Sequence, residues 1–197
     1  HIEMRCRLVV EMVQNFSLYV SGAGMGSDAH KVVAYLAILS EESALTLEAV
    51  TEEDVRAALM RETMQIRQNG VMINLWQLAA AANVLEAPIC SVYPDKGWAV
   101  HRNLNNRTLW PLSPQQHDCV VYIMWTSTRD DVGETHWTAN HFVPLLHIST
   151  ANETITVDSG PFSHYNKFRL NAVNVRDFFL LTWKSQDVVG QVDEILS

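Results

Sequence analysis

The feature that most constrains the fold is a helix-forming segment followed directly by a short, buried strand. Asn74 can cap a helix from Leu75 to Leu85, and its run from Ala79 to Ala82 combines high helix propensity with side chains small enough to pack closely on a sheet. Pro88 then precedes the β-prone run from Ile89 to Tyr93. This pairing predicts a helix that covers one face of a sheet.

Helical patterns dominate the chain before this segment. Apolar residues recur at three- and four-residue spacing from Ile2 to Tyr19, which predicts one amphipathic helix that ends at the segment from Ser21 to Gly24. Asp28 can cap a second helix that ends near Leu39. Thr51, followed three residues later by Asp54, marks the start of a third helix.

Strand candidates dominate the later chain. Two of them, Cys119 to Trp125 and Phe142 to His147, are separated by a polar loop from Thr126 to Asn140. A further run, Thr154 to Asp158, can pair with Phe142 to His147 as a hairpin. Helices followed by an antiparallel-leaning sheet predict an α+β fold, with a small central sheet packed between helices.

Length and charge limit the classes of function. A chain of 197 residues suits one domain with a substantial core. We expect this domain at residues 1–150 and a C-terminal extension, residues 151–197, that packs on it or continues it. The net charge of −8 leaves little scope for phosphate neutralisation, so no direct nucleic-acid binding by this segment is expected. No apolar run approaches the roughly 20 residues of a membrane span, so no membrane contact is expected either.

The three cysteines, Cys6, Cys90 and Cys119, form no CxxC pair, which argues against a disulfide framework and fits a reducing compartment. The expected location is therefore intracellular, cytoplasmic or nuclear. Because none of the three opens a predicted helix, each suits a buried structural thiol better than a nucleophile.

His141 is the sharpest candidate for chemistry, because it stands where the polar loop enters an apolar strand. A histidine on such a rigid edge suits a base that meets a nucleophile from another element. From spacing alone, a strand-start histidine without a catalytic role is the favoured interpretation. The spacing of His136, His141 and His147 matches no zinc signature, and phosphate-loop and dinucleotide signatures are absent, so we expect no metal and no cofactor.

Three blocks of the sequence, taken in order, carry a family resemblance. They are the H-I-E-M-R start at His1 to Arg5, the helix and strand from Leu75 to Pro94, and the pair formed by Val121 to Trp125 and His141 to Leu146. Together they resemble the OTU-like (ovarian tumour) cysteine protease domain, in its vertnin-like branch. The resemblance spans residues 1 to about 147 and implies the OTU-like cysteine protease fold.

The resemblance implies that His141 is the general base that accepts the proton of a thiol. The family's nucleophile belongs to an Asp-x-x-Cys segment that precedes the H-x-x-L-R helix, so it is expected upstream of His1, in a chain that we interpret as a fragment or processed product. Val143 stands where many members carry the Asn or Asp that orients the histidine, and its side chain cannot accept a hydrogen bond. Asn140 is adjacent to His141 but is expected to point to the opposite face if the strand has already begun there. Asp158, on the expected pairing strand, is the candidate third member.

The implied substrate is ubiquitin or a ubiquitin-like modifier, held by its extended C-terminal tail. Trp137, Thr138 and Asn140, in the loop before His141, are the candidate tail contacts. The implied activity is that of a deubiquitinase, a cysteine-type isopeptidase. Two alternatives stay open: a catalytically inactive OTU-like binding module, or a domain of a larger regulatory or mobile-element-derived protein. The sequence upstream of His1 in the natural precursor would separate the enzyme from the binding module.

Overall fold

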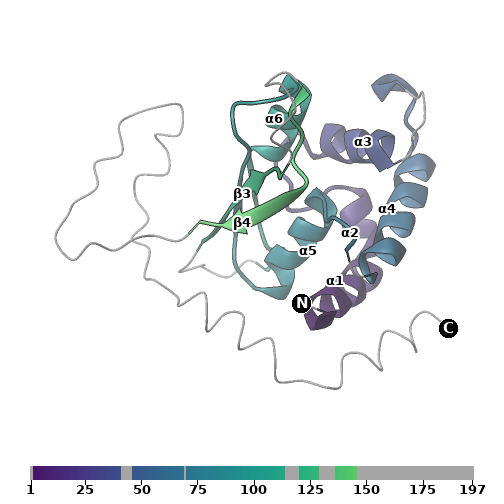
Figure 1. Cartoon of the computed structure of the whole chain (residues 1–197). Coiled ribbons are helices and arrows are strands. Elements are labelled where there is room, and N and C mark those ends of the chain that lie inside the picture. Colours follow the sequence, from purple (N-terminus) through teal and green to yellow (C-terminus); the bar gives the residue numbers. More distant parts are fainter. Residues whose placement is uncertain (1, 41–45, 69, 114–119, 129–135, 146–197) are drawn as a thin grey trace.

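The computed structural model of the chain describes residues 2–40, 46–68, 70–113, 120–128 and 136–145 (Figure 1). The helices are α1 (Ile2–Gln14), α2 (Phe16–Val20), α3 (Ala29–Ser40), the short 3-10 helix η1 (Leu47–Ala49), α4 (Glu52–Ile66), α5 (Leu75–Val84) and α6 (Ala99–Asn105). The strands are β1 (Ile89–Val92), β2 (Arg107–Leu109), β3 (Val121–Thr126) and β4 (His141–Pro144). The predicted α+β class is confirmed.

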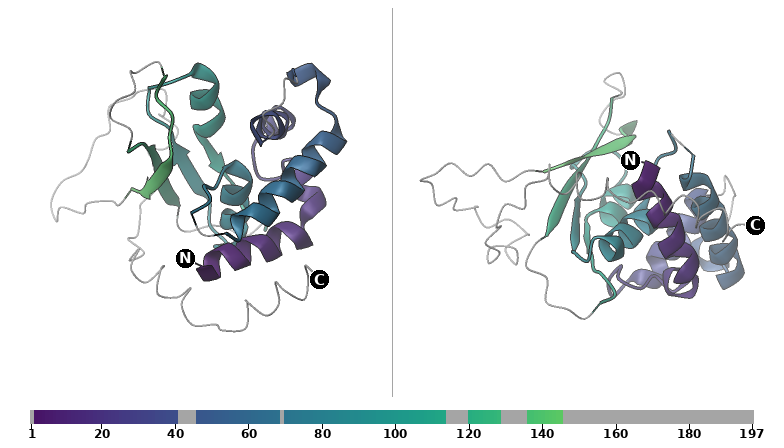
Figure 2. Two further views of the ribbon diagram at one scale, coloured as in Figure 1. Left: turned by 45° about the vertical axis from the view of Figure 1, so that its right-hand side comes forward. Right: turned by 90° about the horizontal axis from the view of Figure 1, so that it is seen from below.

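The strands form one mixed sheet in the order β2-β1-β3-β4. β1 is antiparallel to β2 and parallel to β3, and β3 is antiparallel to β4. Figures 1 and 2 show α1 to α5 gathered on one side of this sheet, so in the described part of the chain the sheet packs against one helical layer. The expected hairpin partner of β4, Thr154 to Asp158, lies outside the described residues, as does the region 151–197.

The predicted sheet-covering helix is α5, which packs against β1 and β2. Its start is held by a capping box in which the Asn74 side chain accepts from the Trp76 amide at 2.9 Å and the Gln77 side chain accepts from the Asn74 amide at 2.7 Å. The buried Trp76 indole donates to the Tyr19 carbonyl oxygen at 3.2 Å. α5 therefore lies between the sheet and the other helices, and the small side chains of its alanine run allow close packing.

The first helix differs from its prediction, because the expected single helix from Ile2 to Tyr19 divides at Asn15 into α1 and α2. Asn15 has a non-helical backbone, and its side chain donates to a Glu11 carboxylate oxygen at 3.0 Å. Side chains of this type compete with the helical backbone for hydrogen bonds. The break brings the Tyr19 hydroxyl to the same Glu11 oxygen, at 2.7 Å, while Tyr19 is fully buried.

The third predicted helix is confirmed as α4, which starts at a capping box between Thr51 and Asp54. Its last turn is tied to α1 by Arg5, which donates to the carbonyl oxygens of Ile66, Gln68 and Val71. Every helix in the described residues is too short or too polar to cross a bilayer.

Candidate functional site

His141 occupies the first position of β4, where it pairs with Thr126 of β3. Within the described residues β4 is an edge strand, because β3 is its one neighbour in the sheet. The imidazole is half-buried and is not sealed in the core. The predicted placement, where a polar loop enters a strand, is therefore confirmed, while a catalytic role stays a prediction.

The Asn140 side chain points toward His141, whereas the alternation of side chains along a strand would direct it to the opposite face. Its Oδ1 lies 2.6 Å from His141 Nδ1. The same Oδ1 accepts from the Thr128 amide at 3.2 Å, and Nδ2 donates to the Thr128 hydroxyl at 2.8 Å. The opposite face was expected only if the strand had already begun at Asn140. Because β4 begins at His141, Asn140 still belongs to the loop and this condition is not met.

The other two candidate tail contacts face different surroundings. Trp137 is half-buried and packs on the main core, with its ring edge-on to Tyr93 at a centroid distance of 5.2 Å. Thr138 is exposed and lines a pocket. Trp137 therefore anchors the loop before His141 to the core, and Thr138 faces the pocket.

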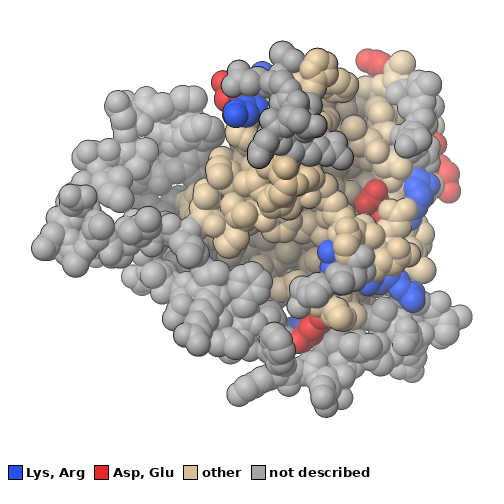
Figure 3. All heavy atoms as spheres, in the orientation of Figure 1, with Lys and Arg blue, Asp and Glu red and all other residues tan. Residues whose placement is uncertain are grey.

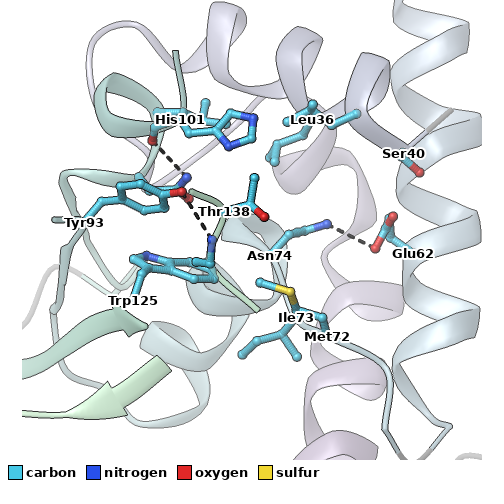
Figure 4. Close-up of a pocket in the computed structure, with 14 residues that line it drawn as sticks. Leu36, Ser40, Glu62, Met72, Ile73, Asn74, Tyr93, His101, Trp125 and Thr138 are labelled. Atoms are coloured by element: carbon cyan, nitrogen blue, oxygen red, sulfur yellow. Dashed lines mark hydrogen bonds between the residues drawn. The ribbon is translucent and has the colours of Figure 1, made fainter. Parts of the chain in front are cut away.

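The pocket measures about 270 Å³ and lies between the helical layer and the end of the sheet near α6. Figure 4 shows Tyr93, His101 and Trp125 on one side of it, and Ser40 and Glu62 on the other. Its lining residues are Leu36, Leu39, Ser40, Glu62, Met72, Ile73, Asn74, Tyr93, His101, Leu104, Asn105, Trp125, Thr138 and Ala139. Thr138 was predicted as a tail contact, whereas the pocket was not predicted, because most of its lining comes from segments distant in the sequence.

Aromatic rings form one side of the pocket, and a carboxylate lies on the other. The rings of Tyr93 and His101 meet edge-on at 6.5 Å. Burial lowers the pKa of His101, so its imidazole stays uncharged near neutral pH. On the opposite side, the Glu62 carboxylate accepts from the Asn74 side chain at 3.0 Å, and the buried Ser40 hydroxyl has no hydrogen-bond partner among the described residues. The pocket can accept an apolar group together with a hydrogen-bond donor.

The described cysteines do not form a nucleophilic site with His141. Cys6 lies within α1 and Cys90 lies within β1, and both are buried free thiols. Burial raises the pKa of the Cys90 thiol, although a hydrogen bond with Thr108 acts in the opposite direction. A raised pKa lowers the thiolate fraction at neutral pH. Cys119 and Asp158, the candidate third member, lie outside the described residues.

Charged side chains on the face seen in Figure 3 lie mostly around its margin, and the centre of this face is largely uncharged. This face carries no continuous patch of Lys and Arg among the described residues. Such a patch is the usual footprint of nucleic-acid binding.

The family model and the similar proteins found by comparison all carry the name vertnin. The family model described as "Vertnin, OTU domain" matches residues 1–126. Mouse vertnin is 26% identical over 167 residues, which cover 81% of this chain and 21% of that protein. Human vertnin is 30% identical over 131 residues, covering 63% of this chain and 17% of that protein. Zebrafish vertnin is 29% identical over 157 residues, covering 75% and 21% respectively.

The chain thus spans about a fifth of the length of these relatives. No solved structure matches it. The family-model match ends at Thr126, the last residue of β3, so Asn140 and His141 follow the matched range. The assignment of a site at the start of β4 therefore rests on the geometry of the structure and not on the family-model match.

Proposed function

The chain belongs to the vertnin-type OTU domain family, and from this premise we propose that it supplies the histidine-bearing part of a cysteine isopeptidase acting on ubiquitin or a ubiquitin-like modifier. The observation that carries the proposal is the position of His141, which is half-buried at the first position of an edge strand. An imidazole in this position is held by the sheet and still accessible to a nucleophile from another segment.

The proposed reaction has two stages. In the first, His141 accepts the thiol proton, the thiolate attacks the isopeptide carbonyl carbon, and the lysine amine leaves with the proton from the imidazolium. In the second, water attacks the thioester, which releases the modifier's carboxylate and restores the thiol. Backbone amides beside the nucleophile would hold the oxyanion. The thiol would come from the family's Asp-x-x-Cys segment, which the resemblance places before His1.

The pocket beside Thr138 supports a peptide-like substrate. Its volume of about 270 Å³ lies below the roughly 300–1,000 Å³ typical of small-molecule pockets, so it suits one or two side chains of an extended segment. Thr138 and Asn140 stay in the proposal as tail contacts. Trp137 contributes mainly by holding the loop, since its ring packs on Tyr93.

A ubiquitin carrying a C-terminal electrophile tests the proposal on the natural protein that includes the sequence before His1. We expect covalent labelling of a cysteine in that preceding segment, and loss of labelling in His141→Ala, because the thiol then lacks its base. His30→Ala is the matched control, since His30 is an exposed histidine of α3. Labelling of Cys6 or Cys90 instead would contradict the assignment of the nucleophile.

The second candidate function is a catalytically inactive module that binds the modifier. Val143 favours it, because this residue occupies the position of the family's usual orienting Asn or Asp and pairs with Met124 inside the sheet. Binding of unmodified ubiquitin, weakened by Trp137→Ala, together with no reaction with the electrophile, would support the module. Unchanged affinity for ubiquitin in Trp137→Ala would show that the loop before His141 is not part of the binding site.

A further inference from the structure

The orientation of the Asn140 amide follows from its contact with the Thr128 backbone. A backbone N–H can only donate, so the Asn140 atom that lies 3.2 Å from the Thr128 nitrogen must be the oxygen, Oδ1. The Asn140 nitrogen then faces the Thr128 hydroxyl at 2.8 Å, where it donates. Both contacts agree with one orientation of the amide, and an exchange of its oxygen and nitrogen would break the first of them.

This orientation decides which nitrogen of His141 carries the proton. Oδ1 of Asn140 lies 2.6 Å from His141 Nδ1, and a carbonyl oxygen can only accept. Its two lone pairs are sufficient for both the Thr128 amide and the imidazole. Nδ1 must therefore be protonated, and in the neutral ring Nε2 is left with a free lone pair. A base that receives a proton from a thiol needs this tautomer.

We propose that Asn140 is the positioning residue of His141, held in place by Thr128, and that it replaces the orienting Asn or Asp that the family usually carries two residues after the histidine. That later position holds Val143, whose side chain accepts no hydrogen bond. Asn140 precedes the histidine, and its location in the loop allows its side chain to turn toward the ring. The catalytic role of Asn140 rests on the proposed function, whereas the protonation of His141 at Nδ1 does not.

Nitrogen NMR of the 197-residue chain, labelled with ¹⁵N in its histidine rings, tests the tautomer directly. The His141 signals are assigned by their loss in His141→Gln. We expect Nδ1 to be protonated and Nε2 to be unprotonated when the ring is neutral. Finding the proton on Nε2 in the unmutated chain would overturn the proposal, whatever the variants do.

Variants separate positioning from a general effect on folding. Asn140→Ala should release the ring to a mixture of tautomers, because the acceptor is gone. Asn140→Asp should restore Nδ1 protonation, since a carboxylate also accepts. Asn103→Ala, the same exchange at an exposed residue of α6, should leave the His141 signals unchanged. A fixed tautomer that survives Asn140→Ala would contradict the assigned role.

Reaction with the ubiquitin electrophile in the natural protein adds a second readout. Asn140→Ala should slow labelling by about tenfold or more, because the base spends less time in the useful tautomer. Asn140→Asp should recover the rate. An inert protein that shows the expected tautomer would contradict the isopeptidase proposal alone. An active protein whose labelling rate is the same in Asn140→Ala would contradict the positioning role alone.

Discussion

His101 and His141 carry the same side chain in different surroundings. His101 lies in α6 between the rings of Tyr93 and Trp98, at centroid distances of 6.5 and 5.9 Å, and burial lowers its pKa. His141 lies at a strand end, where Asn140 accepts from its Nδ1. The first histidine is held neutral by desolvation, whereas the second is oriented by a single acceptor. The second could be singled out from the sequence because the transition from loop to strand is visible locally.

We expect acidification to destabilise the fold through His101. Because its folded-state pKa lies below the ordinary value of 6.5, the unfolded chain takes up the proton first as the pH falls. The contribution of the neutral ring to stability is thus complete above about pH 6.5 and is lost as the pH falls through the lowered pKa.

Urea unfolding at about pH 7.5 and about pH 5.5 measures this effect as a difference in the free energy of unfolding. The difference should shrink in His101→Gln. His30→Gln, at an exposed histidine, is the matched control and should leave the difference between the two pH values unchanged. An equal difference in the unmutated chain and in His101→Gln would show that other groups cause the acid sensitivity.

At the scale of elements, Arg5 joins two helices that are distant in the sequence. The last carbonyl groups of a helix lack partners within the helix. The Arg5 guanidinium donates to the Ile66 oxygen at 2.9 Å, to Gln68 at 3.2 Å and to Val71 at 2.8 Å, so it serves both the end of α4 and the turn after it. The arginine of the H-x-x-L-R element thus has a structural role in this chain.

We expect Arg5→Ala to lower the free energy of unfolding by about 2 kcal/mol, because three carbonyls, two of them partly buried, lose charge-assisted hydrogen bonds. Arg5→Lys should recover only part of this loss, since an ammonium group lacks the planar fork that reaches several carbonyls at once. Urea unfolding measures both variants. Arg56→Ala, which removes an exposed ion pair with Glu52, should cost less than about 1 kcal/mol. Equal losses for Arg5→Ala and Arg56→Ala would contradict the role of Arg5.

At the scale of the whole molecule, the loop before His141 is positioned by the turn that follows β1. Gly97 has a φ of +69°, and a Cβ at this position would collide with the Trp137 carbonyl oxygen. The turn after β1 can therefore approach the loop closely only as glycine. Trp137 then packs on Tyr93, and the loop continues to Asn140 and His141.

We expect Gly97→Ala to displace this loop as well as strain the turn. The matched control is Gly70→Ala, because Gly70 has a φ of +85° but no atom within 4 Å of the added Cβ. Gly70→Ala should cost about 1 kcal/mol from its backbone conformation alone. Gly97→Ala should cost more and should also shift the His141 ring signals in NMR. Identical costs, with His141 signals unchanged in both variants, would show that the close approach does not position the loop.

Local interactions explain what the sequence by itself determined. The starts of α4 and α5, and the strand after α5, follow from caps, alternating apolar residues and a proline, all of which act within a few residues of one another. The family resemblance and the strand start at His141 were accessible for the same reason.

The tertiary structure alone decided the features that join distant segments. These are the parallel pairing of β1 with β3, the pocket beside Thr138, and the hydrogen bonds between Thr128 and Asn140. Each depends on hydrogen bonds or packing between residues that no local pattern relates. An acceptor beside His141 was therefore visible in the sequence as a neighbour, but the direction of its side chain was set by its hydrogen bonds with Thr128.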